Sequence, residues 1–239
     1  MSRHDFRRFF AADRQVVLPV IHVLDEARTA ENIRTLMEVG AHGCFLINHD
    51  FLAVELVSIV QNIRQKFPSL WMGVNFLGIS APKAFDMLAD LQKRGCRIDG
   101  YWSDDAQIDE FASDQDRATK IYEARCSSGW DGLYFGGVAV KYQRIVEAES
   151  YQSVAAIATQ FMDVITTTGP GTGYAAAPEK IEAFRRGAGD HPIAVASGIT
   201  PENAHLYRDA DCFIVATGIN KLGNFYDIDA DRLSKLLSA

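Results

Sequence analysis

The chain alternates short apolar runs with longer amphipathic stretches from residue 16 onward. Val16–Val23 is a continuous apolar run, which is typical of a strand buried on both faces. Helical spacing follows over Thr29–Gly40, and Gly40 is a residue that commonly ends a helix. Strands that alternate with helices in this way predict parallel βαβ units.

The same unit can be counted eight times. After the first pair, the predicted strands are Cys44–Asn48, Leu70–Phe76, Ile98–Ser103, Gly132–Val138, Val164–Thr168, Ile193–Ser197 and Cys212–Ala216. The predicted helices are Phe51–Phe67, Pro82–Gly95, Arg117–Cys126, Ser153–Phe161, Pro178–Arg186, Glu202–Arg208 and Ala230–Leu237. Eight units predict a closed (β/α)8 TIM barrel, an α/β fold of the ribulose-phosphate-binding type.

A doubly wound open sheet is the main alternative, because it also alternates strands and helices. That fold usually carries a glycine fingerprint after its first strand, where this chain has His22-Val23-Leu24-Asp25. The chain has 239 residues, close to the roughly 250 that a barrel needs. It shows no linker, so we expect a single barrel over residues 1–239.

Residues 1–14 precede the first strand and combine arginines with phenylalanines. A transit peptide has arginines too, but Asp5, Asp13 and the shortness of the segment argue against one. We expect a short N-terminal helix or arm whose Phe6, Phe9 and Phe10 plug the bottom of the barrel.

Composition narrows the class of protein further. A net charge of −7 without a basic run argues against nucleic acid as a partner. No apolar stretch is long enough to span a bilayer. The four cysteines form no Cys-x-x-Cys pair, which predicts reduced thiols in a cytoplasmic protein. A homo-oligomer stays open, because barrels often associate.

The last two predicted strands both end in small residues, Ser197-Gly198 and Thr217-Gly218. In a TIM barrel these two loops commonly bind phosphate. Glycine lets main-chain N–H groups approach an anion, and the N-terminus of a following helix adds further donors. We therefore predict a phosphate site here, the alternative being that the glycines only make tight turns.

A glycine-rich loop follows the sixth strand. It reads Gly169-Pro170-Gly171-Thr172-Gly173-Tyr174. Alternating glycines permit close approach of the backbone to a ligand or the hinging of a lid, although Gly-Pro pairs also mark plain turns. Because the loop precedes the predicted phosphate site, we expect Gly169, Gly171 and Gly173 to contribute to it.

The other strand ends are unusually polar, and in a barrel they face the common mouth. We expect Lys141 and Asp50 near the reacting centre, with Asn75 and Thr168 orienting the substrate. Lys141 could pair with an anion, act as a base or form a Schiff base, or it could be an ordinary surface lysine. The remaining candidates at the mouth are His22, Asn48, His49, Trp102 and Asp104.

Neither a resident metal nor a cofactor is expected. No His-x-His or His-Glu-x-x-His spacing indicates zinc. Asp50 and Asp104, together with phosphate oxygens of a substrate, would suit magnesium, which prefers oxygen ligands. Magnesium is therefore the one metal that stays open.

Several segments together resemble the BtpA/SgcQ family over nearly the whole chain. They are Met72–Leu77, Val140-Lys141, Thr168–Gly173, Ser197–Asn203, Ala210–Lys221 and Asp227–Leu233. The resemblance implies a phosphate-binding barrel whose relatives are labelled phosphoribosyltransferases or assembly factors of a photosynthetic complex. The chain departs from the family after His22, where a proline-rich stretch is replaced by Val23–Ala27, and at Asn48-His49-Asp50.

The sequence thus predicts an enzyme that acts on a small phosphorylated metabolite, either a sugar phosphate or a phosphoribosyl compound. Isomerase, lyase and phosphoribosyltransferase-like transferase remain open. The alternative is a non-catalytic assembly factor of the BtpA kind, or a sensor of a phosphorylated metabolite.

Overall fold

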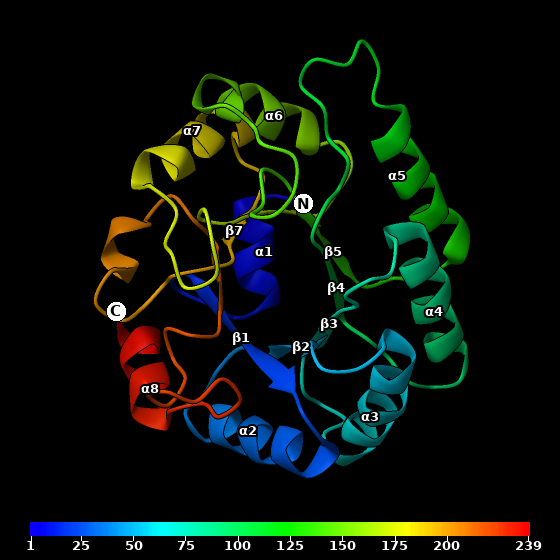
Figure 1. The fold of residues 1–239 in the computed structure, drawn as a ribbon, viewed down its shortest axis with the longest axis vertical. Coiled ribbons are helices and arrows are strands. Elements are labelled where there is room, and N and C mark those ends of the chain that lie inside the picture. Colours follow the sequence, from blue (N-terminus) through cyan, green and yellow to red (C-terminus); the bar gives the residue numbers. More distant parts are fainter.

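A computed structural model describes residues 1–239 and contains a closed barrel of eight parallel strands in the order β1 to β8 (Figure 1). The strands are β1 (Val16–Val23), β2 (Cys44–Asn48), β3 (Met72–Asn75), β4 (Gly100–Ser103), β5 (Leu133–Gly137), β6 (Val164–Thr167), β7 (Ile193–Val195) and β8 (Cys212–Val215). Val16 of β1 pairs with Cys212 of β8, which closes the ring. The prediction of a (β/α)8 barrel is confirmed, and the open sheet is excluded.

Helices surround the barrel (Figure 1). They are α2 (Glu26–Glu38), α3 (Ala53–Lys66), α4 (Ala81–Lys93), α5 (Asp116–Ser128), α6 (Tyr151–Ala158), α7 (Pro178–Ala188) and α8 (Ala230–Ser238), with a 3-10 turn, η1 (Ala148–Ser150), before α6. No helix is long and apolar enough to cross a membrane.

The prediction of a helix after the seventh strand is wrong. In place of Glu202–Arg208 there is a single 3-10 turn, η2 (Ala204–Leu206). The Asn203 side chain accepts a hydrogen bond from the Thr200 N–H and donates one to the Gly198 carbonyl. These bonds close a tight turn after β7. The Asn203 side chain thus takes up backbone groups that a helix would use, and only the short 3-10 turn forms.

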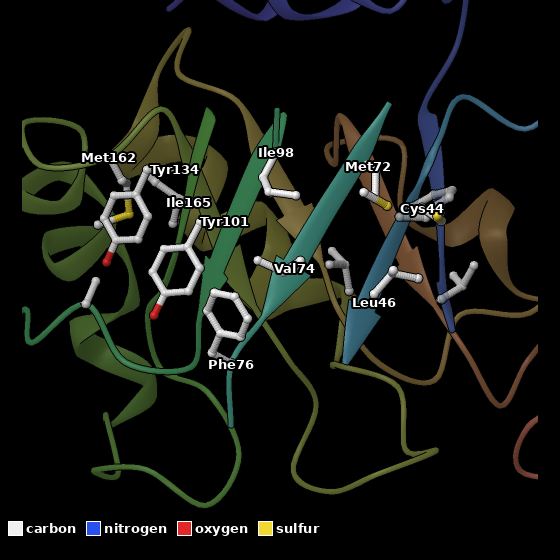
Figure 2. Close-up of a cluster of buried hydrophobic side chains, with 14 of the residues drawn as sticks. Cys44, Leu46, Met72, Val74, Phe76, Ile98, Tyr101, Tyr134, Met162 and Ile165 are labelled. Carbon is white, nitrogen blue, oxygen red and sulfur yellow. The ribbon is translucent and has the colours of Figure 1, made fainter. Parts of the chain in front are cut away.

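Along each strand, every second side chain faces the inside of the barrel, and the side chains between them face the helices. Val16, Leu18 and Val20 of β1 belong to a cluster inside the barrel that also contains Phe45 and Phe135. The barrel is therefore a packed core below its mouth. On the outer face of the strands, Leu46, Val74, Tyr101 and Tyr134 lie in a row across β2 to β5 (Figure 2).

The N-terminal helix α1 (Arg3–Phe9) closes the bottom of the barrel. Phe6 is fully buried, with its ring 6.2 Å from that of Phe135. Phe10 packs edge-on against Trp71, at 5.1 Å between ring centroids. Phe9 was expected in the plug as well, but it is 50% exposed, because it lies on the outer side of the same short helix.

Candidate functional site

A cavity of about 390 Å³ lies at the carboxyl ends of the strands. Its volume falls within the range of about 300–1,000 Å³ that is typical of small-molecule sites. Nine of the residues predicted at the mouth line it: His22, His49, Trp102, Asp104, Lys141, Gly173, Ser197, Gly198 and Thr217. Residues far apart in the chain thus meet here because the barrel brings all strand ends to one face.

Lys141 and Asp104 bring opposite charges into this cavity. The Lys141 ammonium donates to the Thr172 hydroxyl at 3.2 Å. Burial lowers the pKa of Lys141, and the charges of Tyr142 and Asp104 oppose that shift. Burial raises the pKa of Asp104, although a hydrogen bond from Asn75 at 3.0 Å and the charge of Lys141 oppose that shift. A base and an acid whose pKa values are moved toward neutrality are suited to proton transfer.

His22 stands at the mouth end of β1 and is only 8% exposed. Its ring stacks on Phe225, with 3.9 Å between centroids, and lies 4.7 Å from the ring of His49. Burial lowers its pKa to about 3, helped by the positive charges of His49 and Lys141. His22 is therefore neutral at pH 7, and neither of its ring nitrogens has a hydrogen-bond partner.

The loops after β7 and β8 hold main-chain N–H groups that are not used by the chain. The amides of Gly198, Thr217 and Gly218 make no hydrogen bond within the protein. Gly198 has φ +65°, and a Cβ there would lie 2.1 Å from the Ala175 nitrogen, so only glycine fits. No α-helix begins at either loop, so the expected contribution of helix N-termini is wrong. The donors come from the turns alone.

Ser197 ties the glycine-rich loop to the end of β7. Its hydroxyl accepts from the Gly169 N–H at 2.8 Å and donates to the Tyr174 carbonyl at 3.1 Å. Gly169 packs against the carbonyl of Tyr174, where a Cβ would lie at 2.2 Å. The loop is thus folded back on itself, with Gly171 under the Tyr174 ring and Gly173 close to the Thr217 hydroxyl.

Close packing also explains the glycine after β8. A Cβ on Gly218 would lie 1.9 Å from the carbonyl oxygen of Ile199. Gly218 therefore holds the β8 loop against the β7 loop, and it does not itself line the cavity.

Seven predicted residues lie outside this cavity: the glycines Gly169, Gly171 and Gly218 already described, and four polar residues. Asp50 is exposed and accepts a hydrogen bond from the Tyr226 hydroxyl. Asn48 bonds to the backbone of Phe51 and Leu77. Asn75 reaches the site only through Asp104, and the Thr168 hydroxyl is used by the Lys141 N–H and the Gly169 carbonyl.

The proposed magnesium ligands do not come together. Asp104 lines the cavity and Asp50 does not, and each is engaged by a protein donor, Asn75 and Tyr226 respectively. No group of three or more His, Cys, Asp or Glu side chains is arranged to hold a metal ion. The residues present do not fit a magnesium site.

Two residues that the sequence did not single out support the mouth. Phe225 comes from the β8–α8 loop, which a paired hydrogen bond from Arg28 to Asp227 attaches to α2. The Lys180 ammonium donates to the carbonyls of Ala139 and Thr168, at 2.7 and 2.8 Å. Burial lowers the pKa of Lys180 to about 8. Neither residue lies at a strand end, so no sequence signal marked them.

Comparison with known proteins finds the same architecture in solved structures. No family model matches the chain, and a search of curated proteins also finds no match. Many solved structures do match. The Legionella pneumophila tryptophan synthase alpha chain is 17% identical, with TM-score 0.67, covering 100% of this chain and 97% of that one.

Two further neighbours were solved with ligands. A Thermoplasma acidophilum (S)-3-O-geranylgeranylglyceryl phosphate synthase, in complex with its substrate sn-glycerol-1-phosphate, has TM-score 0.65 and 14% identity over 100% and 98% of the chains. A Methanocaldococcus jannaschii orotidine 5′-monophosphate decarboxylase, bound to an inhibitor, has TM-score 0.66 and 11% identity over 95% and 100%. At these identities the likeness shows the fold: the chain is a (β/α)8 barrel of the kind that these enzymes share.

Proposed function

We propose that this protein is an enzyme acting on a small phosphorylated metabolite, a sugar phosphate or a phosphoribosyl compound. One observation carries the proposal: the unused amides after β7 and β8 include those of Gly198 and Thr217, which line the same cavity as Lys141. Main-chain N–H groups and an ammonium are the donors that bind a phosphate dianion.

Lys141 lines the same cavity as these loops and would share that anion. Its ammonium contacts Thr172, and the next residue, Gly173, approaches the Thr217 hydroxyl of the β8 loop. Asp104 lines the same cavity and takes the part that we expected of Asp50. Lys141 and Asp104 would then move a proton to or from the substrate, a step that isomerases and lyases share. The neighbouring synthase was solved with sn-glycerol-1-phosphate, and the neighbouring decarboxylase is named for orotidine 5′-monophosphate, so both support this class of substrate.

Thermal unfolding in the presence of inorganic phosphate and ribose 5-phosphate tests the proposal. A ligand at 100 times its dissociation constant stabilises the folded protein by about 2.7 kcal/mol. We expect ribose 5-phosphate to raise the melting temperature of the wild type but not of Gly198→Ala. An equal rise in both proteins would place the anion elsewhere and contradict the assignment.

A second candidate is a non-catalytic role in which a partner protein covers the mouth, as the resemblance to the BtpA/SgcQ family implies. Large apolar side chains of the mouth loops favour it: Tyr142, Ile145, Tyr174 and Leu222 are all mostly exposed. This role predicts no stabilisation by any phosphorylated metabolite, so the same thermal experiment separates the two candidates.

A further inference from the structure

The mouth cavity contains more than the donors of a phosphate site. Eight buried side-chain atoms in the protein lack a hydrogen-bond partner, and three of them belong to residues that line this cavity. They are the two ring nitrogens of His22 and the indole nitrogen of Trp102. A buried polar group without a partner costs about 1–3 kcal/mol, so a ligand that supplies the partner recovers that free energy.

The two side chains lie at different distances from the loops after β7 and β8: Trp102 is across the mouth from them, and His22 is next to them. In the ring of eight strands, β4, which carries Trp102, lies opposite β8, which leads to Thr217. His22 is on β1, beside β8. A ligand held by the loops after β7 and β8 must therefore extend across the mouth to reach Trp102, which a bare phosphate or a short chain does not do.

The walls between these points are apolar and partly aromatic. Val20, Ile47, Leu77, Ile214 and Phe225 line the cavity together with Trp102. The ring of Phe225 already lies nearly parallel to that of His22, with an interplanar angle of 22°. This side of the cavity therefore accommodates flat rings.

We propose that the ligand carries, besides its phosphate, a planar heterocycle with hydrogen-bonding ring atoms that binds between Trp102 and His22; this inference rests on the function proposed above. An indole N–H can only donate, so the heterocycle must offer an acceptor to Trp102. A neutral imidazole donates from one nitrogen and accepts at the other. A ring in which a carbonyl stands beside an N–H, as in uracil, satisfies both side chains.

Isothermal titration with ribose 5-phosphate and with uridine 5′-monophosphate tests the inference, since the two share the sugar phosphate and differ in the ring. Recovering one or more unpaired groups predicts that the uridine compound binds the wild type at least about tenfold more tightly. Trp102→Phe keeps an aromatic ring but removes the donor, so we expect it to abolish most of that preference while ribose 5-phosphate binds as before.

Trp71→Phe is the matched control. The Trp71 indole nitrogen is also buried without a partner, but it lies toward the bottom of the barrel beside Phe10 and outside the cavity. We expect Trp71→Phe to leave the preference for the uridine compound unchanged. Melting temperatures without ligand show whether each variant is folded, and His22→Phe provides the second variant should Trp102→Phe unfold.

The two proposals fail in different ways. Equal binding of both compounds to the wild type would overturn the heterocycle and leave the phosphate site standing. A preference that survives in both Trp102→Phe and His22→Phe would place the ring elsewhere and also overturn it. If neither compound nor inorganic phosphate binds, the phosphate site itself is wrong.

Discussion

The polar side chains at the two ends of the barrel differ in how completely they are paired. At the bottom, Asp211 is fully buried and binds the side chains of Arg3, Arg7 and Arg185, at 2.8, 3.1 and 2.5 Å. It also accepts a hydrogen bond from the Ile193 N–H. At the mouth, Lys141 has only a hydroxyl partner, and the nitrogens of His22 have none.

This difference in pairing corresponds to a difference between stabilising the fold and binding a ligand. A buried carboxylate that is surrounded by guanidinium groups fixes α1 and β8 in place, and it has no capacity left for a ligand. The groups at the mouth keep unused donors and altered pKa values, which do not stabilise the fold at neutral pH as an ion pair does but can be used in binding. The bottom is therefore expected to determine stability and the mouth to determine activity.

Asp211→Asn gives the largest expected effect and tests the bottom. The change leaves three arginines without their carboxylate, and removing one partner of a buried ion pair costs about 3–5 kcal/mol of unfolding free energy. Urea denaturation measures the loss, with Glu182→Gln, an exposed carboxylate on α7, as control. A strong loss of ribose 5-phosphate binding by Asp211→Asn in its folded state would break the separation between the two ends.

Gly198→Ala should affect the mouth through backbone geometry. Alanine at φ +65° costs about 1–2 kcal/mol, and its Cβ would also overlap Ala175. We expect lower stability and loss of ribose 5-phosphate binding. Gly78→Ala isolates the first cost, because Gly78 has φ +79° with nothing within 4 Å of the added Cβ. Equal effects of the two variants on binding would show that the β7 loop is not part of the site.

Lys141→Met should reduce binding with little effect on folding. A hydrogen bond to a charged group is worth about 1.5–3 kcal/mol, so the affinity for ribose 5-phosphate should fall about ten- to hundredfold. The free energy of unfolding should stay close to the wild-type value, because this ammonium is only half buried. Titration calorimetry measures the first quantity and urea denaturation the second. Lys83→Met, on the exposed side of α4, should change neither.

The last prediction concerns His22 and appears only in acid. Its folded pKa of about 3 lies below the ordinary value of 6.5, so the unfolded chain takes up a proton first as the solution is acidified. This contribution to stability is complete above pH 6.5 and is lost as the pH falls toward 3, by at most about 1.4 kcal/mol per pH unit. His22→Phe should be less sensitive to acid over this range. Parallel pH profiles of wild type and variant would show that His22 is not held neutral.

The sequence predicted the barrel well because its strands are marked locally. Val16–Val23 and Cys44–Asn48 were predicted to the residue, since a strand buried on both faces needs an unbroken apolar run. The turn after β7 could not be predicted in the same way. There the hydrogen bonds of one side chain, Asn203, outweighed a helical pattern only seven residues long.

The site was predicted only in part, for a different reason. Glycines and polar residues mark a strand end, but they do not tell which of several consecutive side chains faces inward. Asp50 and Asp104 look alike in sequence, yet only Asp104 lines the cavity. Thr168 is buried with its hydroxyl bonded on both sides, which depends on the neighbouring loops. The unpartnered nitrogens of His22 and Trp102 are likewise properties of packing, which a single sequence does not show.

The solid interior of the barrel, filled by Phe45 and Phe135 and closed below by Phe6, has one more consequence. The packed interior separates the mouth from the bottom of the barrel. Mutations that reshape the mouth loops therefore need no compensating changes at the bottom. Such a scaffold is evolvable: new substrates could be acquired by substitutions on one face, while the stability reserve that tolerates them is kept on the other.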